Sequence, residues 1–378
     1  MAGCAAATSP RSASSTREAR GAGPGLGVGL HRASGLVAAS GEAMIAEPRR
    51  LALLEAGKLK LAAKARLAEG GQAAPYEAAV LYHAAARAEQ RTLLAMEAPS
   101  PEARLANAIE RCACLIEGFD AMFILEVAWA DVLIASSAVP GKTAAAMRSR
   151  IDPKMSEFVS RYQRVLAKTP TFKAWIEANG PWRASRSLDR EIDRFLKVFP
   201  GDARVWSIRS WAYLQAGDIT SAWEAVQRAR ELMPEETMFM QIELDLVPKH
   251  LSSARAEAQL DGIYTQIERG GANADICFGF VSAAMQLAHK GRHREKLLRQ
   301  ALDAAIAGGR AAPDSPDDRK MFRVMELSLR EMLAGRKPTV EILYRCGLGR
   351  LATTAKQADP MAIVLSRTTP SRRLDAAA

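Results

Sequence analysis

Residues 203–234, ARVWSIRSWAYLQAGDITSAWEAVQRARELMP, constrain the fold of this chain more than any other stretch. They predict two short amphipathic helices that meet at a tight Gly217-Asp218 turn and end at Pro234, which cannot continue a helix. The second helix carries one apolar stripe, made of Ala222, Trp223, Val226 and Ala229. A hairpin of this kind cannot bury its apolar face alone, so it predicts stacked neighbours.

The spacing within this stretch resembles a tetratricopeptide (TPR) repeat, a family with small and aromatic residues at fixed offsets. The matching residues are Trp206 and Tyr213 for the aromatics, Ser210 for the helix crossing, Gly217-Asp218 for the turn, Ala222 and Ala229 for the second helix, and Pro234 for the terminator. The resemblance implies an all-α chain, a right-handed α-solenoid of antiparallel hairpins. Arg209 stands where the family carries a buried leucine. Either its stem lies along the hairpin with the guanidinium in solvent, or the hairpin is slightly rotated.

More degenerate units flank this hairpin. Pro200 lies one repeat length before Pro234 and follows a helix with Leu188, Ile192, Phe195 and Phe199 on one face. The partner of that helix is TFKAWIEANG, which contains Trp175 and ends at Asn179-Gly180. Downstream, a helix with Phe280, Ala284 and Leu287 inward leads through a Gly291 turn to another helix.

Five regions follow from composition and periodicity. They are a disordered low-complexity segment (1–43), an N-terminal helical region (44–168), TPR-like repeats (169–307), capping helices (314–355) and a flexible basic tail (356–378). The first segment is rich in Ala, Gly, Ser and Arg, and Met44 is an alternative start. The five cysteines are odd in number and scattered, which favours a reducing, cytoplasmic location. An organelle transit peptide in 1–43 is the alternative.

The N-terminal region predicts five helices. The first two are Leu51–Glu69 and Pro75–Met96, the second with Tyr76, Val80 and Ala84 inward. The third is opened by Ser100-Pro101 and has Leu105, Ile109, Cys112 and Ile116 inward, and the fourth is Asp120–Ala135. The fifth is capped by Asp152-Pro153 and has Met155, Phe158, Val159, Tyr162 and Leu166 on one face. Asp120–Ala135 is the most apolar. Its length and its Glu126 and Asp131 favour a core helix over a membrane span.

The C-terminal part predicts a linker, two helices and a tail. Gly308–Pro313 is the linker, Ser315-Pro316 caps a helix with Phe322, Met325, Leu329 and Met332 inward, and Val340–Leu351 forms the last helix. The chain has a formal net charge of +10 and a pI near 9.5, but this charge is spread over helix faces and tails. Nucleic acid is therefore not the favoured partner.

The sequence contains side chains that could react or bind ligands, but their spacing does not predict a catalytic, cofactor or metal site. SSAVPGKT (Ser136–Thr143) resembles a Walker A loop, but it follows a predicted helix and lacks the first glycine. Cys112 and Cys114 lie two apart on a helix and so point to different sides. His289 and His293 flank a turn, and His83 fits a packing role. We expect no enzyme.

Binding is the better-supported expectation. In TPR proteins the first helix of each hairpin lines a concave groove, and the matching residues here are Arg204, Ser207, Trp211, Leu214 and Gln215. Trp211 is either an anchor for a partner or a packing residue against the preceding hairpin. The Lys/Asn clamp with which some relatives hold a C-terminal carboxylate is absent, because Ser207 and Trp211 take those places.

The sequence thus predicts a protein-interaction adaptor that binds a peptide or helix of an unknown protein partner. Two alternatives stay open. One is a nucleic-acid-associated regulator that uses the basic tails. The other is an enzyme, or the regulatory subunit of one, since fold alone does not exclude it.

Overall fold

All regular structure in the computed structural model is helical, which confirms the all-α prediction for the residues it describes. These residues are 31–119, 122–178, 186–271, 273–289, 293–312, 315–352 and 359–368. The expected disordered segment 1–43 lies mostly outside them. The predictions for Trp175, for the Asn179-Gly180 helix end and for the Gly291 turn also fall outside the described side chains and backbone.

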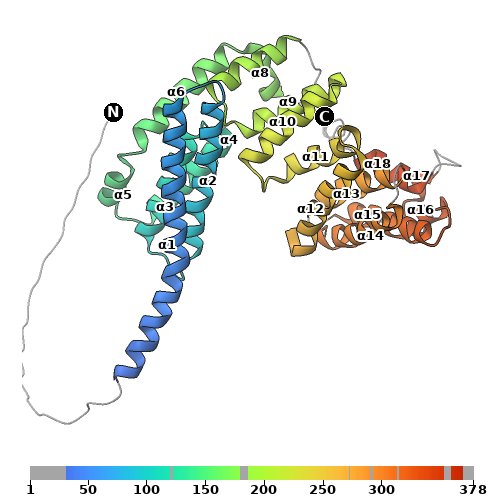
Figure 1. Ribbon diagram of the computed structural model, residues 1–378, viewed down its shortest axis with the longest axis horizontal. Helices are drawn as coiled ribbons and strands as arrows, with labels where there is room; N and C mark the ends of the chain where they lie inside the picture. The colour runs from blue at the N-terminus through green and yellow to red at the C-terminus, as the bar shows by residue number, and fades with distance from the viewer. Residues whose placement is uncertain are drawn as a thin grey trace, which may run out of the picture.

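The first four helices form a row in chain order (Figure 1). They are α1 (His31–Glu69), α2 (Ala74–Leu94), α3 (Pro101–Glu117) and α4 (Met122–Ser137). As predicted, the Ser100 hydroxyl caps α3 by accepting a hydrogen bond from the Ala103 N–H at 3.2 Å. The first helix begins much earlier than the predicted Leu51, so residues 31–43 are helical here rather than part of an irregular segment.

One prediction of which face is buried is wrong in this row. On α2 the buried residues include Ala78, Tyr82, Ala85 and Glu89, whereas the predicted Tyr76, Val80 and Ala84 are only partly buried. The reason is that α2 lies between α1 and α3, and its alanines let both neighbours approach.

Helix α4, which is predicted to be a core helix rather than a membrane span, contributes one side to the core. It buries Leu125, Ala128 and Val132 but leaves Val127 and Ile134 exposed. This helix lies at the edge of the row, where α3 and α5 (Gly141–Arg148) contact it. It is therefore not a core helix on all sides.

An aromatic core joins the next three helices, α6 (Asp152–Ala167), α7 (Pro170–Ala178) and α8 (Arg186–Val198). Phe158 and Tyr162 of α6 meet Phe195 and Phe199 with ring centroids 5.4–5.5 Å apart, and Phe172 of α7 joins them. The predicted stripes of α6 and α8 are confirmed, except that Val159 is only partly buried.

The hairpin of residues 203–234 forms as predicted. Its helices are α9 (Ala203–Ala216) and α10 (Ile219–Leu232), which pack against each other. Gly217 takes the left-handed conformation that the turn requires, with φ of 78°, and Asp218 caps α10 through the Ser221 N–H. The Ser210 hydroxyl donates to the Ala222 carbonyl at 2.7 Å, so the two helices cross closely at these small residues.

A further hairpin follows directly, made of α11 (Thr237–His250) and α12 (Ser253–Gln266) and closed by the short π-helical turn η1 (Ile267–Gly271). Three helices, α8, α10 and α12, then bury equivalent residues 34 positions apart in the sequence. These residues are Leu188, Ala222 and Ala256; Ile192, Val226 and Leu260; and Phe195, Ala229 and Ile263. The preceding helices repeat the same period, with Phe172, Trp206 and Met240 all buried.

The C-terminal part corrects three boundaries. It contains α13 (Ala274–Ala288), α14 (Arg294–Ala311), α15 (Pro316–Leu333), α16 (Glu341–Arg345), α17 (Gly349–Ala352) and α18 (Pro360–Thr368). The predicted linker Gly308–Pro313 is wrong at its start, because Gly308 and Gly309 continue α14. A Cβ at Gly308 would lie 2.3 Å from the Phe322 ring, so this glycine serves close helix packing rather than a turn.

The two other corrections concern the chain end. The predicted single helix Val340–Leu351 is split into α16 and α17 at Gly347, whose φ is 71°. Part of the predicted flexible tail, 356–378, is the helix α18, which buries Met361 and Val364 against the second core.

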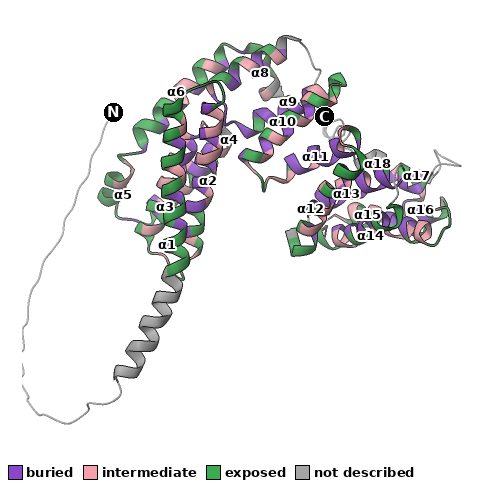
Figure 2. Cartoon of the chain, in the orientation of Figure 1, coloured by how far each residue is buried: buried purple, intermediate pink, exposed green. Residues whose placement is uncertain are grey.

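Two apolar cores meet at α11 (Figure 2). One face of α11 gives Phe239, Ile242 and Leu246 to the core that runs from α2 to α10. The other gives Leu244 and Val247 to the core that runs on to α18. This helix therefore couples the two halves of the molecule.

Candidate partner-binding face

The five residues predicted to line a groove lie along α9 with unequal exposure. Arg204 and Gln215 are exposed, and Trp211 and Leu214 are partly buried against the first core. Ser207 is buried, with its hydroxyl donating to the Arg204 carbonyl, so it offers no surface to a partner. Four of the five residues therefore remain accessible.

The next helix pair repeats this face. Met238, Gln241, Asp245 and Lys249 lie on α11 exactly one 34-residue period after Arg204, Ser207, Trp211 and Gln215. Met238 and Lys249 are exposed, and Gln241 and Asp245 are partly buried. Because α9 contacts α11, the two rows lie on neighbouring helices. We call the accessible residues of both rows the α9–α11 face: Arg204, Trp211, Leu214, Gln215, Met238, Gln241, Asp245 and Lys249.

Asp245 gives this face its main electrostatic feature. Burial raises the pKa of its carboxyl to about 6, and Lys249, one turn further along α11, opposes that rise. Asp245 occupies the position on α11 that Trp211 occupies on α9. An indole and a partly desolvated carboxylate on adjacent helices suit a cationic side chain, through cation–π and charge-assisted contacts.

Arg209 lies on the side of α9 that contacts α8, and only 17% of its side chain is exposed. Its Nη2 lies 2.7 Å from Asp193 Oδ1 on α8 and donates to the Tyr213 hydroxyl at 2.9 Å. The guanidinium also lies 5.5 Å from the Trp206 ring centroid. Of the two alternatives for Arg209, a guanidinium in solvent is therefore not what the structure shows, because the charge is paired with Asp193 on α8.

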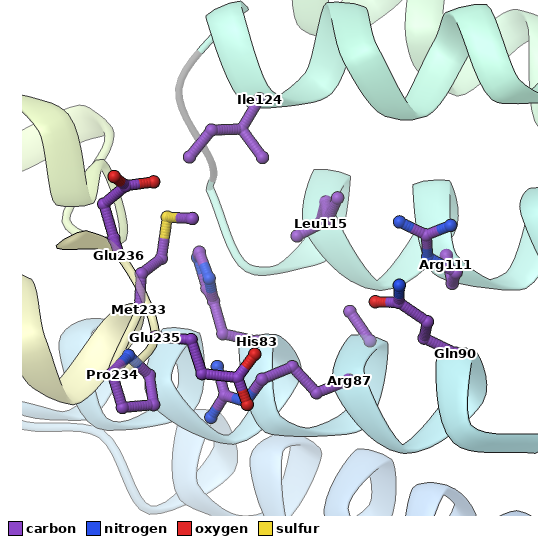
Figure 3. A pocket seen from close by; sticks show the side chains of 11 residues that line it. His83, Arg87, Gln90, Arg111, Leu115, Ile124, Met233, Pro234, Glu235 and Glu236 are labelled. Atoms are coloured by element: carbon purple, nitrogen blue, oxygen red, sulfur yellow. The ribbon is translucent and has the colours of Figure 1, made fainter. Parts of the chain in front are cut away.

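A cavity of about 240 Å³ lies where the row of the first helices meets the α10–α11 turn (Figure 3). His83, Arg87 and Gln90 of α2 line one side, and Met233 to Glu236 of the turn line the other. Burial lowers the pKa of His83 to about 4, so this imidazole is neutral near pH 7. No serine, threonine, cysteine or lysine lines this cavity.

The contacts around this cavity form a joint between α2 and the C-terminal end of α10. Arg87 Nη1 donates to the Leu232 carbonyl at 2.8 Å. The Tyr76 hydroxyl contacts the Arg228 carbonyl at 3.0 Å and Glu231 Oε2 at 2.7 Å. Helix α2 is thus fastened to the end of α10, although the two are far apart in sequence.

The other motifs have structural roles. In the Walker-like segment, Ser136 lies in the last turn of α4 and its hydroxyl donates to the Val132 carbonyl. Gly141 begins α5, so this segment joins two helices. Cys112 and Cys114 are buried, and burial raises the pKa of both thiols to about 12, which leaves them unreactive. His289 and His293 are exposed.

The described residues form neither a metal site nor a membrane-spanning helix. In that part of the chain no group of three or more His, Cys, Asp or Glu side chains is placed to hold a metal ion. No described helix combines the length and apolar character that crossing a bilayer requires. No protein-family model, curated protein or solved structure matches the chain.

Sequence reasoning misses α11 and with it half of the α9–α11 face. The equivalent of Gly217 is Leu251 and the equivalent of Pro234 is Glu268, so the turn and terminator signals are lost in this unit. A signal was present nonetheless, because Ala256 and Leu260 follow Ala222 and Val226 by the same period.

Proposed function

We propose that this protein is a non-catalytic interaction scaffold, a TPR-like right-handed α-solenoid that binds a peptide or helix of another protein on the α9–α11 face. One observation carries the proposal. Three accessible positions of α9, those of Arg204, Trp211 and Gln215, recur as accessible positions on α11 with the period at which the helices behind them repeat their buried positions. Stacked helical repeats use such aligned faces to bind extended partners.

The face favours a partner segment with a basic side chain at its centre. Trp211 is partly buried, which limits the entropy that it loses on binding, and it offers a large apolar surface. Asp245, at the equivalent position of the next helix, supplies the opposite charge. The exposed Arg204 and Lys249 lie toward the ends of the two rows, where acidic flanking residues fit.

Selection of displayed random peptides on the immobilised full chain tests this function. The selected peptides should be enriched in Lys or Arg. Trp211→Ala should weaken their binding about 30-fold or more, which corresponds to a hot-spot loss of about 2 kcal/mol. The control is Gln163→Ala, which changes an exposed side chain on α6 and should leave binding intact.

The pH dependence of this binding gives a second readout. Affinity for a basic peptide should fall as the pH drops through about 6, because Asp245 then becomes protonated. Asp245→Asn should bind weakly at every pH and lose this dependence. Peptides that bind the Trp211→Ala and Asp245→Asn proteins as tightly as the parent would show that the binding site lies elsewhere.

A further inference from the structure

Helix α1 packs on the row through alanines and leaves several of its leucines exposed. Ala56 and Ala63 are fully buried against the rest of the row. Leu51, Leu54 and Leu61 have 54%, 50% and 69% of their surface exposed. An amphipathic helix that packed only within its own row would place these leucines inward. The outer face of α1 is therefore an apolar surface that the described part of the chain leaves uncovered.

The exposed residues of this face follow a heptad pattern. They recur at alternating spacings of three and four, and all of them are exposed: Leu51, Leu54, Lys58, Leu61, Ala65 and Ala68. These are the a and d positions of a two-stranded coiled coil, with leucine at two of the three d positions. Lys58 falls at an a position, where one polar residue specifies the oligomeric state at some cost in stability.

The charges beside this stripe identify the occupant as a second copy of the chain in parallel orientation. Two of the three g positions carry Arg50 and Lys64, two of the three e positions carry Glu55 and Glu69, and the middle pair, Gly57 and Ala62, is uncharged. In a parallel pair each g residue faces the e residue five positions further along the partner helix, so basic residues meet acidic ones. An antiparallel pair would bring g to g and e to e, which places like charges together.

We infer that α1 pairs with α1 of a second copy as a short parallel coiled coil. Packing on α2 already holds α1 as a helix, so association need not order it. Within one copy, Glu55 lies 2.7 Å from Arg91 and Arg50 lies 2.8 Å from Glu47, but these pairs are exposed and cost little to exchange. The dimer would place two α9–α11 faces on one particle, although the inference does not rest on their role.

The molar mass of the full chain by light scattering during gel filtration tests this directly. The parent should be a dimer, and Leu54→Lys with Leu61→Lys should be a monomer with unchanged helical circular dichroism. The matched control is Val127→Lys with Ile134→Lys, which changes the other exposed apolar stripe, on α4, and should remain dimeric. A monomeric parent, or a dimer that survives the α1 changes, would overturn the inference.

Charge exchange tests the pairing of specific residues. Arg50→Glu with Lys64→Glu gives acidic residues at all four charged flanking positions, and Glu55→Lys with Glu69→Lys gives basic ones. Each protein alone should be largely monomeric, and an equal mixture should form heterodimers. If each variant dimerises alone as well as the parent, the e and g charges do not face one another.

Cysteine crosslinking tests the orientation in a background with Cys4→Ser and Cys346→Ser. In a parallel pair, Leu54→Cys and Leu61→Cys should each form a disulfide with its own equivalent on mild oxidation. An antiparallel pair allows at most one of the two. Crosslinking at only one position, or at neither, would contradict the parallel arrangement.

Discussion

Asp202 caps α9 from a position that water does not reach. Its Oδ1 accepts a hydrogen bond from the Val205 N–H at 2.9 Å, and only 1% of the residue is exposed. Burial raises the pKa of this carboxyl to about 7, against the hydrogen bonds that favour the charged form. Between pH 4 and 7 the folded state therefore binds more protons here than the unfolded state, and stability falls as the pH rises through this range.

Asp202→Asn should remove this loss because asparagine caps a helix equally well and carries no charge. At pH 8 the variant should be more stable than the parent by on the order of 2–4 kcal/mol, and the two should converge near pH 4. Urea unfolding of both proteins from pH 4 to 8 measures the difference. A constant difference across this range would mean that Asp202 does not titrate in it.

Gly308 marks the closest approach between α14 and α15. Gly308→Ala should cost about 1–3 kcal/mol, because the new Cβ would meet the Phe322 ring at 2.3 Å and the Cys277 Cβ at 2.8 Å. Gly309→Ala is the matched control. Its Cβ would meet Phe322 at an ordinary 3.5 Å, and the helix gains up to about 1 kcal/mol from alanine. Equal thermal stabilities for the two variants would contradict this packing.

At the scale of single elements, periodicity predicts a helix well when one side of it is covered. The stripes of α6 and α8 follow from spacing alone, since Phe158 and Ile192 each belong to a regular apolar row that is buried. The period is less informative for α2, which lies between α1 and α3 and buries residues other than the predicted ones, and for α4, some of whose apolar residues lie on an exposed side. The hydrophobic period of a helix does not show which of its sides neighbouring helices will cover.

The same limit applies to the candidate site. The α9 half of the face follows from the resemblance of residues 203–234 to one repeat. The α11 half follows only when the 34-residue period is recognised. The buried positions of α8, α10 and α12 show this period, whereas the residues equivalent to Gly217 and Pro234 do not. The partial burial of Asp245 depends on how α9 and α11 pack, so spacing alone does not predict its raised pKa.

A buried carboxylate joins α10, α11 and α12. Glu243 Oε1 accepts hydrogen bonds from the amides of Gln227 at 3.0 Å and Gln259 at 2.7 Å. Glu243 Oε2 lies 3.1 Å from Arg230 Nε. All four side chains converge at the boundary between two successive hairpins.

Arg230→Met should therefore cost about 2–4 kcal/mol, because it leaves a buried carboxylate without its counter-charge. Glu243→Gln should cost less, since the amide keeps an acceptor for both glutamines, and the Arg230 that loses its carboxylate is less buried and still donates to the Pro234 carbonyl. Chemical denaturation of the two variants compares the costs. A larger loss for Glu243→Gln than for Arg230→Met would contradict the assigned roles.

At the scale of the whole molecule, the joint between α2 and α10 makes the first ten helices more than a linear stack. Arg87 of α2 donates to the Leu232 carbonyl, and Tyr76 reaches the same end of α10. This joint holds the first helices against the hairpin that carries the α9 side of the α9–α11 face. It should limit bending of the chain between α4 and α9.

Arg87→Met should loosen this joint and cost about 1–3 kcal/mol, the range for a hydrogen bond to a charged group. Hydrogen exchange should rise in α2 and at the end of α10. Arg91→Met, one turn further along α2, removes only an exposed pair with Glu55 and should change stability by less than about 1 kcal/mol. Equal protection of α2 in both variants would show that the joint does not depend on Arg87.

Site-specific photo-crosslinking in the native cell tests the central claim most directly. A photoreactive amino acid in place of Gln241, within the α9–α11 face, should capture a partner protein, and the adduct should disappear when Trp211→Ala is added. The same amino acid in place of Gln163, on the exposed side of α6, should capture none. Adducts of equal yield from both positions, or an adduct at position 241 that persists with Trp211→Ala, would contradict the account.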